Sequence, residues 1–393
     1  MKKVVDLFAG CGGLSLGFQD AGYEIIGAYE YWDKAADTYE ANFDHPIYRE
    51  NLSDASGAIK RIRCLEPDII IGGPPCQDFS HAGKRVEDKR AALTEVFAEI
   101  VTTISPRWFV MENVDRAQKS KTYGVARDIL KKAGYGLTEV ILNASLCGVP
   151  QRRKRFFCFG SRNAEDGFLL DYIDSAMGKK EMTLKDYFGE SLDIEYYYRH
   201  PRNYSRRAIY SIGEPSATIR GVNRPVPKGY PGHHLDAKKL DGTIRPLTTL
   251  ERSLIQTFPP DFKWLGSKTD IELMVGNAVP VKLAEFVAKA LSHHIQKDTF
   301  NENACIVYAP FLDWLRGSHA MSERSQRDTM SRLRRADSIC SIPSAPEAHY
   351  LFMLEQSENY RSLTPTVRSQ LKRAVKLYSE YCKAGQTLNG VVT

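Results

Sequence analysis

The chain has 393 residues, of which 42% are hydrophobic and 26% charged, so a globular protein of two or three domains is expected and general disorder is excluded. Its net charge of +6 permits a polyanionic partner without requiring one. The eight cysteines include no Cys-x-x-Cys pair, no apolar run could span a bilayer, and the first residues lack a signal-peptide pattern. We therefore expect a cytoplasmic protein with neither a disulfide framework nor a membrane segment.

Strand-like and helix-like segments alternate over the first 160 residues. Short apolar runs predict strands at 4–8, 24–30, 68–72, 108–112, 137–143 and 155–160. Amphipathic stretches predict helices at 14–21, 33–42, 91–104 and 122–133. This alternation is typical of an α/β fold with a mostly parallel sheet and helices on both faces.

The pattern changes after about residue 162. Tyr, Arg, Pro and Gly accumulate up to about residue 245 and helical periodicity fades, which predicts a smaller, irregular domain of strands and loops. Helical patterning returns at 250–257 and again after Pro280. Beyond about residue 300 the chain is Ser- and Arg-rich and mainly helical, and its clearest helix is capped by Thr364.

A glycine-rich turn follows the first predicted strand. Gly10 and Gly12 fit a dinucleotide-binding fingerprint, but Ser15 stands where the third glycine would be, which disfavours a pyrophosphate site. Glu30 ends the second strand, where a carboxylate can bind both hydroxyls of a ribose. The turn therefore favours a nucleoside-containing cofactor over the alternative, a tight structural turn beside a solvated Glu.

Two further strand ends carry reactive side chains. Cys76 follows the strand at 68–72 behind two prolines, and such a rigid loop suits a nucleophilic thiol better than an inert cysteine. Glu112 ends the strand at 108–112. If these strands are neighbours, a thiol and a carboxyl lie at one edge of the sheet and can grip one substrate ring. The alternative for Glu112 is an ordinary carboxylate at a helix N-terminus.

Two segments are rich in cations. Residues 151–155 hold four Arg or Lys ahead of an apolar strand, which suits contact with a phosphate or a base edge, or a solvated turn. Residues 196–230 interleave seven Arg or Lys with six Tyr against the single acid Glu214, a mixture typical of nucleic-acid contacts. The alternative there is a Tyr-rich core with a solvated edge. His233 and His234 follow without further ligands, so no metal site is predicted.

Taken together, these motifs resemble the DNA cytosine-5 methyltransferases of bacterial restriction-modification systems. The family's motifs stand in the family's order over about residues 1–298: Asp-Leu-Phe-Ala-Gly-x-Gly-Gly at 6–13, Pro-Pro-Cys-Gln-x-Phe-Ser at 74–80, Glu-Asn-Val at 112–114, Gln-x-Arg-x-Arg at 151–155 and Gly-Asn-Ala-Val-Pro at 276–280. Arg-Pro-Leu-Thr at 245–248 looks like the motif that precedes the last one. Any one motif is weak, but six in order are specific.

The resemblance implies a Rossmann-like sheet that uses S-adenosyl-L-methionine, with a first catalytic and cofactor-binding part at 1–161 and a closing part at 246–298. It implies a target-recognition domain at 162–245 and leaves 299–393 as a helical C-terminal extension, for which packing is the default role. The family's usual Asp at the adenine contact is best matched here by Asn51, whose side-chain oxygen can accept the same hydrogen bond. By position, the residues lining the cofactor site would be Phe8, Ala9, Gly10, Gly12, Gly13, Leu14, Glu30, Tyr31, Asn51, Pro75, Asn277 and Val279.

The resemblance also implies catalytic roles. Cys76 would add to C6 of a cytosine flipped out of the duplex, and protonated Glu112 would donate to N3. Arg155 would contact the base, with Arg153 as its support. The implied partners are double-stranded DNA and a cognate restriction endonuclease, and we expect a monomer. DNA contacts are expected at Gln77, Ser80, Arg199, Arg202, Arg206, Arg207, Arg220, Arg224 and Lys228.

Three other functions fit the sequence less well. A cytosine-5 methyltransferase acting on transfer RNA would carry a Cys-Phe-Thr motif, whereas residues 144–148 read Ala-Ser-Leu-Cys-Gly. A non-catalytic DNA-binding module would have no need of intact Cys76, Glu112 and Arg155. An NAD-dependent dehydrogenase is disfavoured by Ser15 and by the cysteine loop.

Overall fold

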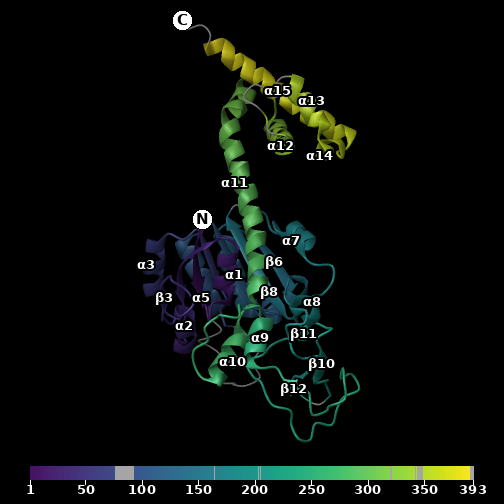
Figure 1. Cartoon of the computed structure of the whole chain (residues 1–393). Helices are drawn as coiled ribbons and strands as arrows, with labels where there is room; N and C mark the ends of the chain where they lie inside the picture. Colours follow the sequence, from purple (N-terminus) through teal and green to yellow (C-terminus); the bar gives the residue numbers. More distant parts are fainter. Residues whose placement is uncertain are drawn as a thin grey trace. The chain divides into compact units, whose positions relative to one another are not determined.

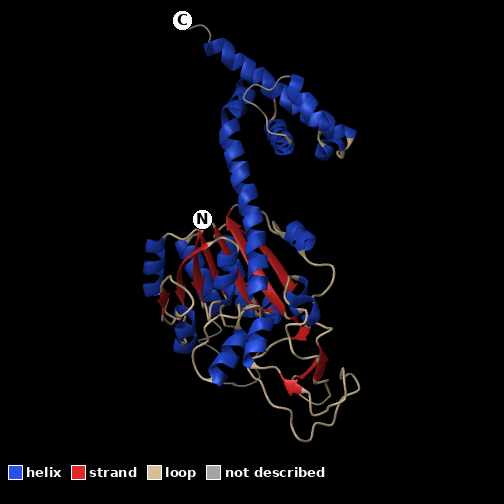
Figure 2. Cartoon of the chain, viewed as in Figure 1, coloured by secondary structure: helices blue, strands red, loops and turns tan. Residues whose placement is uncertain are grey.

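In the computed structural model, the chain folds into two compact units, Met1–Ser292 and His293–Thr393. Figure 1 labels their helices and strands, and Figure 2 distinguishes helix, strand and loop. Within the described residues, no helix combines the length and apolar character needed to cross a membrane. The structure describes residues 1–75, 93–162, 164–201, 203, 205–318, 321–340, 342 and 348–389.

A seven-stranded sheet forms the centre of the first unit. Within it, β8 pairs antiparallel with β5 and β6, and the remaining pairings are parallel. The predicted mostly parallel sheet is thereby confirmed. In the spatial order β3-β2-β1-β4-β5-β8-β6, its strands are β1 (Lys3–Leu7), β2 (Glu24–Tyr29), β3 (Ile47–Tyr48), β4 (Ile69–Gly72), β5 (Trp108–Val114), β6 (Tyr135–Asn143) and β8 (Lys154–Arg162).

Helices cover both faces of the sheet. Val5 and Leu7 face a core that they share with α3, α5 and α6, whereas the alternate residue Asp6 points toward α1. On that second side α1 packs against the first turns of α11, where Gly17 lies so close that an added Cβ would be 2.4 Å from the methyl of Ala284. The helical elements of this part are α1 (Gly13–Asp20), α2 (Asp33–Glu40), α3 (Ser56–Leu65), α5 (Leu93–Ile104), η1 (Asp115–Lys119), α6 (Lys121–Lys132), η2 (Ala144–Leu146) and the start of α11 (Val281–Ser318).

A smaller region follows β8. Its strands β9 (Tyr196–Tyr198), β10 (Ile209–Ser211) and β12 (Arg245–Pro246) form one sheet in the order β10-β9-β12, and β11 (Ser216–Ala217) pairs with β7 (Gln151–Arg152). The prediction of strands and loops alone was wrong, because α7 (Leu170–Ala176) and α8 (Leu184–Phe188) also lie here. A capping box of Thr183 and Asp186 starts α8, a local signal too short to show as periodicity.

The predicted helix at 250–257 is α9 (Thr249–Ile255). Two helices of the first unit were missed from the sequence, α3 and α10 (Lys268–Asn277). Beyond the first unit, the prediction that the end of the chain is mainly helical is confirmed. The second unit has its own core, to which Phe311, Leu333, Leu354 and Val375 belong. Its helices are the end of α11, α12 (Glu323–Ile339), α13 (Ala348–Gln356), α14 (Glu358–Arg361) and α15 (Pro365–Asn389).

Candidate active site

The carboxyl ends of four strands are level at one edge of the large sheet. In the parallel register Leu7 pairs with both Tyr29 and Gly72, and Gly72 pairs with Met111. The segments that follow β1, β2, β4 and β5 therefore emerge together, at the edge where parallel sheets bind ligands. The expectation that the strands before Cys76 and Glu112 are neighbours is confirmed.

The glycine-rich loop after β1 is folded around the carboxylate of Glu30. One carboxylate oxygen accepts the N–H of Gly10 at 2.8 Å, and the other accepts the N–H of Trp32 at 2.7 Å. Burial raises the pKa of Glu30, and these backbone donors act against that rise. Gly10 and Gly12 have φ angles of 58° and 96°, which favour glycine. A Cβ on Gly10 would meet nothing within 4 Å, so the space beside the loop is open.

The last sequence motif closes on the same loop. A Cβ on Gly13 would lie 2.3 Å from the carbonyl oxygen of Val279, so this close approach requires glycine. On the other side, a Cβ on Gly12 would lie 2.3 Å from the ring of Phe43. Val279 therefore lies beside the loop as its predicted role requires, and Asn277 is exposed at the end of α10.

Glu112 is buried at the end of β5, with 9% of its surface exposed. Arg155 on the adjacent strand β8 lies with its Nε 2.9 Å from Oε1 of this carboxyl. Burial raises the pKa of Glu112 above its ordinary value, although the charges of Arg155 and Arg153 act to lower it. The other oxygen faces the loop after β4, since a Cβ on Gly73 would lie 3.2 Å from it. Glu112 therefore keeps its proton up to a higher pH than a carboxyl at the surface does.

One hydrogen bond ties the ends of β4 and β5 together, and it was not predicted from the sequence. Asn113 donates from Nδ2 to the carbonyl oxygen of Pro74 at 3.1 Å, which fixes the start of the cysteine loop beside the acid. The sequence offered one sign of this hydrogen bond, the side-chain amide of Asn113 next to Glu112 in the Glu-Asn-Val motif. The predicted site residues Cys76, Gln77 and Ser80 lie outside the described residues.

Arg153 is turned inward and is 1% exposed. Its guanidinium donates to the carbonyl oxygens of Ile219, Gly276 and Ala278 at 2.9, 2.9 and 3.0 Å. Burial lowers the pKa of Arg153, and the charge of Arg155 lowers it further. The side chain joins the corner between β7 and β8 to the smaller region and to the last motif. These contacts fit a supporting role for Arg153.

Two glutamines reinforce this join. Gln151 accepts the N–H of Ile219 at 2.9 Å and donates to the side-chain oxygen of Gln256 at 2.7 Å. Gln256 in turn donates to the carbonyl oxygens of Val275 and Ala278 at 2.5 and 3.1 Å. Gln256 was missed from the sequence, because nothing near it marks a partner 105 residues away.

A buried ion pair between α9 and α10 was also missed. Arg252 and Glu272 are 3% and 4% exposed and contact each other. Glu272 accepts the hydroxyl of Thr249 at 2.8 Å and the side-chain amide of Asn223 at 3.3 Å, while Arg252 donates to the carbonyl of Arg220. Burial lowers the pKa of Arg252 to about 10. Both helices are thereby fastened to the smaller region.

A family profile described as C-5 cytosine-specific DNA methylase matches residues 2–293. The chain belongs to this family. The type II methyltransferase M.HindV of Haemophilus influenzae is 55% identical over 294 residues, which cover 74% of this chain and 96% of M.HindV. M.HgiDI of Herpetosiphon aurantiacus is 54% identical over 296 residues, which cover 75% and 96%. The chain is therefore a DNA (cytosine-5)-methyltransferase of the restriction-modification type.

Solved structures confirm the Rossmann-like fold of the methyltransferase. Spodoptera frugiperda DNMT2, solved as a triple mutant, matches with a TM-score of 0.55 and 20% identity over 74% of this chain and 99% of its own. S. pombe Dnmt2 matches with a TM-score of 0.55 and 17% identity over 74% and 98%. At these identities the likeness concerns the fold alone. Residues 294–393 of the methyltransferase lie beyond the family profile.

Three cations that we predicted to contact DNA are engaged within the methyltransferase itself. Arg199 donates to the carbonyl oxygen of Thr218 at 2.8 Å, and Arg220 donates to a backbone carbonyl. Arg207 forms a two-pronged pair with Glu214 and lies over a Tyr ring. Because these side chains bond to other groups of the smaller region that follows β8, their geometry favours a structural role over a phosphate contact.

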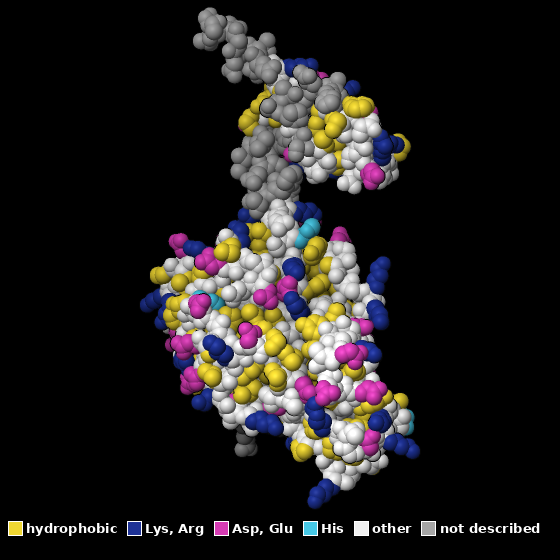
Figure 3. Space-filling model, in the orientation of Figure 1, with side chains coloured by type: hydrophobic (Ala, Val, Ile, Leu, Met, Phe, Trp, Pro, Cys, Tyr) yellow, Lys and Arg dark blue, Asp and Glu magenta, His cyan; other side chains and the backbone are white. Residues whose placement is uncertain are grey.

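The other predicted cations that the structure describes are exposed to solvent. These are Arg206, Arg224 and Lys228, and Figure 3 shows Lys and Arg side chains at the tip of the loops near β10 and β12. Arg202 lies outside the described residues.

Two predicted adenine contacts of the methyltransferase have different surroundings. Tyr31 lies two residues after the end of β2 and is 69% exposed, so its ring can receive a ligand. The side-chain oxygen of Asn51 accepts the N–H of Ser53 at 3.0 Å, which gives this residue a local turn role. Pro75 is exposed at the start of the cysteine loop. The cofactor contacts of all three residues stay predictions.

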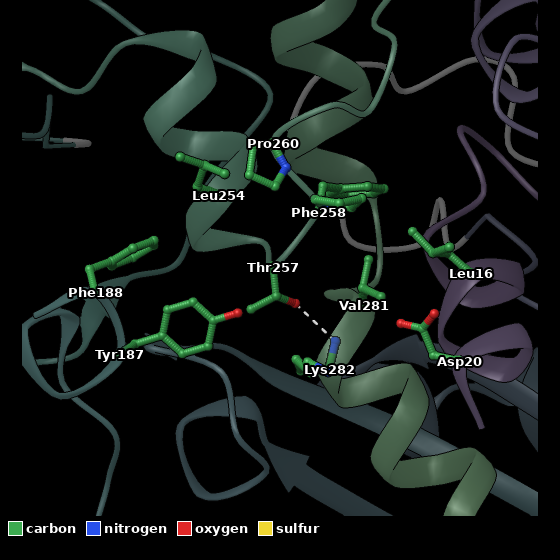
Figure 4. Close-up of a pocket in the computed structure, with 11 residues that line it drawn as sticks. Leu16, Asp20, Tyr187, Phe188, Leu254, Thr257, Phe258, Pro260, Val281 and Lys282 are labelled. Carbon is green, nitrogen blue, oxygen red and sulfur yellow. Dashed lines mark hydrogen bonds between the residues drawn. The ribbon is translucent and has the colours of Figure 1, made fainter. Parts of the chain in front are cut away.

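The methyltransferase also has a pocket of about 350 Å³ between α1, α8, the end of α9 and the start of α11 (Figure 4). Apolar side chains such as Leu16 and Phe258 line it beside the charged Asp20 and Lys282. None of the predicted site residues lines this pocket, but its lining residue Phe258 borders the glycine-rich loop, since a Cβ on Gly13 would lie 3.2 Å from the Phe258 ring. Over the described part of the chain, no group of three or more His, Cys, Asp or Glu is arranged to hold a metal ion.

Proposed function

We propose that the enzyme transfers a methyl group from S-adenosyl-L-methionine to C5 of a cytosine flipped out of a specific double-stranded DNA sequence, through a covalent adduct with Cys76. Glu112 carries this proposal. It is a buried carboxyl with a raised pKa, and it stands at the same sheet edge as the Glu30 loop. Activation of a pyrimidine ring needs such a proton donor close to the methyl donor.

The loop residues fit S-adenosyl-L-methionine. Each oxygen of Glu30 accepts one backbone N–H, and a carboxylate oxygen can accept a second bond, here from a ribose hydroxyl. Exposed Tyr31 offers an aromatic face to the adenine. The open space beside Gly10 lets the backbone approach the ligand closely. When bound, S-adenosyl-L-methionine supplies an electrophilic methyl group on sulfur.

The chain's own side chains would activate the cytosine. The thiolate of Cys76 adds to C6, which gives C5 the nucleophilic character it needs to accept the methyl group. Protonated Glu112 donates to N3, where negative charge would otherwise develop. Arg155 orients that carboxyl and contacts the base, while Arg153 supports it from within. A base then removes the C5 proton, the Cys76 thiolate leaves C6, and the N3 proton returns to Glu112.

The target region would bind the duplex. Exposed Arg206, Arg224 and Lys228 suit phosphate contacts, while side chains of the same region read base edges in the major groove. The cytosine must leave the stack before Cys76 can reach C6. The type II names of the relatives support a role in protecting DNA against a cognate endonuclease.

A mechanism-based trap tests the proposal. Fluorine at C5 cannot be removed as a proton, so elimination stalls after methyl transfer and the enzyme stays joined to DNA. Wild-type enzyme with S-adenosyl-L-methionine and 5-fluorocytosine DNA should give a complex that survives denaturing electrophoresis. Cys76→Ser should not, because a hydroxyl is a much weaker nucleophile than a thiol. A resistant band from Cys76→Ser would place the nucleophile elsewhere and refute the proposal.

Cys11 provides the control. It lies in the cofactor loop, but burial raises the pKa of its thiol to about 12, so it carries almost no thiolate at neutral pH. Cys11→Ala should weaken cofactor binding at most and should leave the trapped complex intact at saturating cofactor.

A further inference from the structure

A buried row of hydrogen bonds runs away from the cofactor loop. Oδ2 of Asp6 accepts the hydroxyl of Ser15 at 2.6 Å. The Ser15 oxygen lies 2.7 Å from the hydroxyl of Tyr39, which lies 2.6 Å from Nε2 of His45. Asp6, Ser15 and Tyr39 are 0% exposed, whereas His45 is only half-buried. The row therefore connects a buried carboxyl in β1 to a side chain that reaches solvent.

When Asp6 is ionised, proton counting fixes the direction of these bonds. Ser15 has one hydroxyl proton and gives it to Asp6, so Tyr39 must donate to Ser15 and Nε2–H of His45 must donate to Tyr39. If Asp6 is protonated instead, every bond can reverse: Asp6 donates to Ser15, Ser15 to Tyr39, and Tyr39 to a bare Nε2. The row thus has two complete arrangements with the same number of protons. They interconvert when a doubly protonated His45 passes its Nε2 proton to Tyr39, Tyr39 passes one to Ser15 and Ser15 passes one to Asp6, which leaves His45 neutral with its proton on Nδ1.

The row lies directly beneath the loop that would hold the cofactor. Tyr39 stacks on Phe43 with ring centroids 4.3 Å apart, and a Cβ on Gly12 would run into both rings. The second oxygen of Asp6 is buried without a hydrogen-bond partner. A change of charge on Asp6 is consequently not screened by water, and the donors that act on this carboxyl are the hydroxyl and the backbone N–H of Ser15.

The charged groups around the row are few. Glu30, at the end of β2, opposes the ionisation of Asp6, and Asp44 beside His45 favours the imidazolium. Burial is the largest influence on both ends: it raises the pKa of Asp6 to about 7 and lowers the pKa of His45. The pKa of Asp6 therefore lies near neutral pH, and the pKa of His45 lies below its ordinary value.

We propose that Ser15, Tyr39 and His45 are positioning residues that conduct a proton to and from Asp6, and that the charge of Asp6 tunes the cofactor loop toward cationic ligands. This inference rests on the proposed function, because S-adenosyl-L-methionine carries a positive sulfonium. Ionised Asp6 adds a second negative charge to that of Glu30, so a cation should bind better when Asp6 has lost its proton. The released proton leaves through His45.

A pair of ligands isolates this effect. S-adenosylhomocysteine has the same adenosine and amino-acid groups but a neutral sulfur that lacks the methyl group. The contribution of the methyl group does not depend on pH, so the pH dependence of the ratio of the two dissociation constants reports the sulfonium charge. Calorimetry on the full chain between pH 6 and 9 should show the preference for S-adenosyl-L-methionine rising about three- to tenfold across neutral pH. Ser15→Ala removes the donor to Asp6, so the midpoint of that rise should move to higher pH.

Two further variants complete the test. Tyr39→Phe keeps the ring under Gly12 but breaks the row, so it should also displace the midpoint, and it stands in if Ser15→Ala does not fold. Tyr135→Phe removes an equally buried hydroxyl, which bonds the Pro106 carbonyl instead, and should leave the midpoint unchanged. If wild type binds both ligands with a ratio independent of pH, the relay is refuted while the proposed function stands. If wild type binds neither ligand, the proposed cofactor and the relay both fail.

Discussion

Replacing Arg153 by Met should lower the free energy of unfolding of the first unit by about 3 kcal/mol. The substitution keeps an apolar stem but leaves the carbonyl oxygens of Ile219, Gly276 and Ala278 without this donor. A buried acceptor that loses its partner costs about 1–3 kcal/mol, so three give about 3–9 kcal/mol. Burying the guanidinium itself costs several kcal/mol, and the substitution relieves that cost. The net loss should therefore lie near the lower bound.

Urea unfolding followed by tryptophan fluorescence measures this loss, and hydrogen exchange of the amides around 219 and 276–278 shows where it occurs. Arg152→Met is the matched control. The guanidinium of Arg152 is about half exposed and pairs with Glu181 at the surface. Its replacement should therefore lower the free energy of unfolding by less than about 1 kcal/mol. A loss for Arg153→Met no larger than that of the control would refute the claim that these three bonds hold the unit together.

Three further predictions concern catalysis, DNA and the chain end. Glu112→Gln should lower the single-turnover rate far more than it lowers DNA affinity, and equal losses in rate and affinity would contradict this role. Because burial raises the pKa of Glu112, the wild-type rate should fall as pH rises through that pKa. Arg206→Gln with Arg224→Gln should reduce the slope of log affinity against log salt by about 2, whereas Arg207→Gln should leave it unchanged; an unaltered slope in the double variant removes these arginines from the DNA. A chain ending near residue 298 should still bind S-adenosyl-L-methionine by calorimetry, since the loop contacts lie in the first unit; a folded truncation that does not bind would assign the second unit to the site.

The sheet and the edge that carries the site could be predicted from the sequence because their signals are local. Apolar runs end in glycine, proline or acidic residues, and parallel strands bring such ends together. The short α8 was hidden because a capping box sets it, and five residues show no periodicity.

Contacts between distant segments were beyond the reach of sequence patterns. Gln256 is an ordinary polar residue until folding brings Gln151 against it. The sequence shows the cations of the target region but not their partners, so Arg207 was taken for a DNA contact although Glu214 engages it. The row from Asp6 to His45 likewise depends on β1, α1 and α2 packing together.

The smaller region that follows β8 is connected to the corner between β7 and β8 largely through its own main-chain atoms. Arg153 and Gln151 grip the carbonyl and amide of Ile219, groups that every residue except proline would also present. Nearby, Gly221 and Gly276 meet so closely that a Cβ on Gly276 would lie 2.1 Å from the Gly221 nitrogen. The contacts to Ile219 and Gly221 therefore do not depend on which side chains stand at these two positions, apart from the need for a small residue at the close approach. Residues of this region that lie away from these contacts can therefore change in sequence without any change in the large sheet.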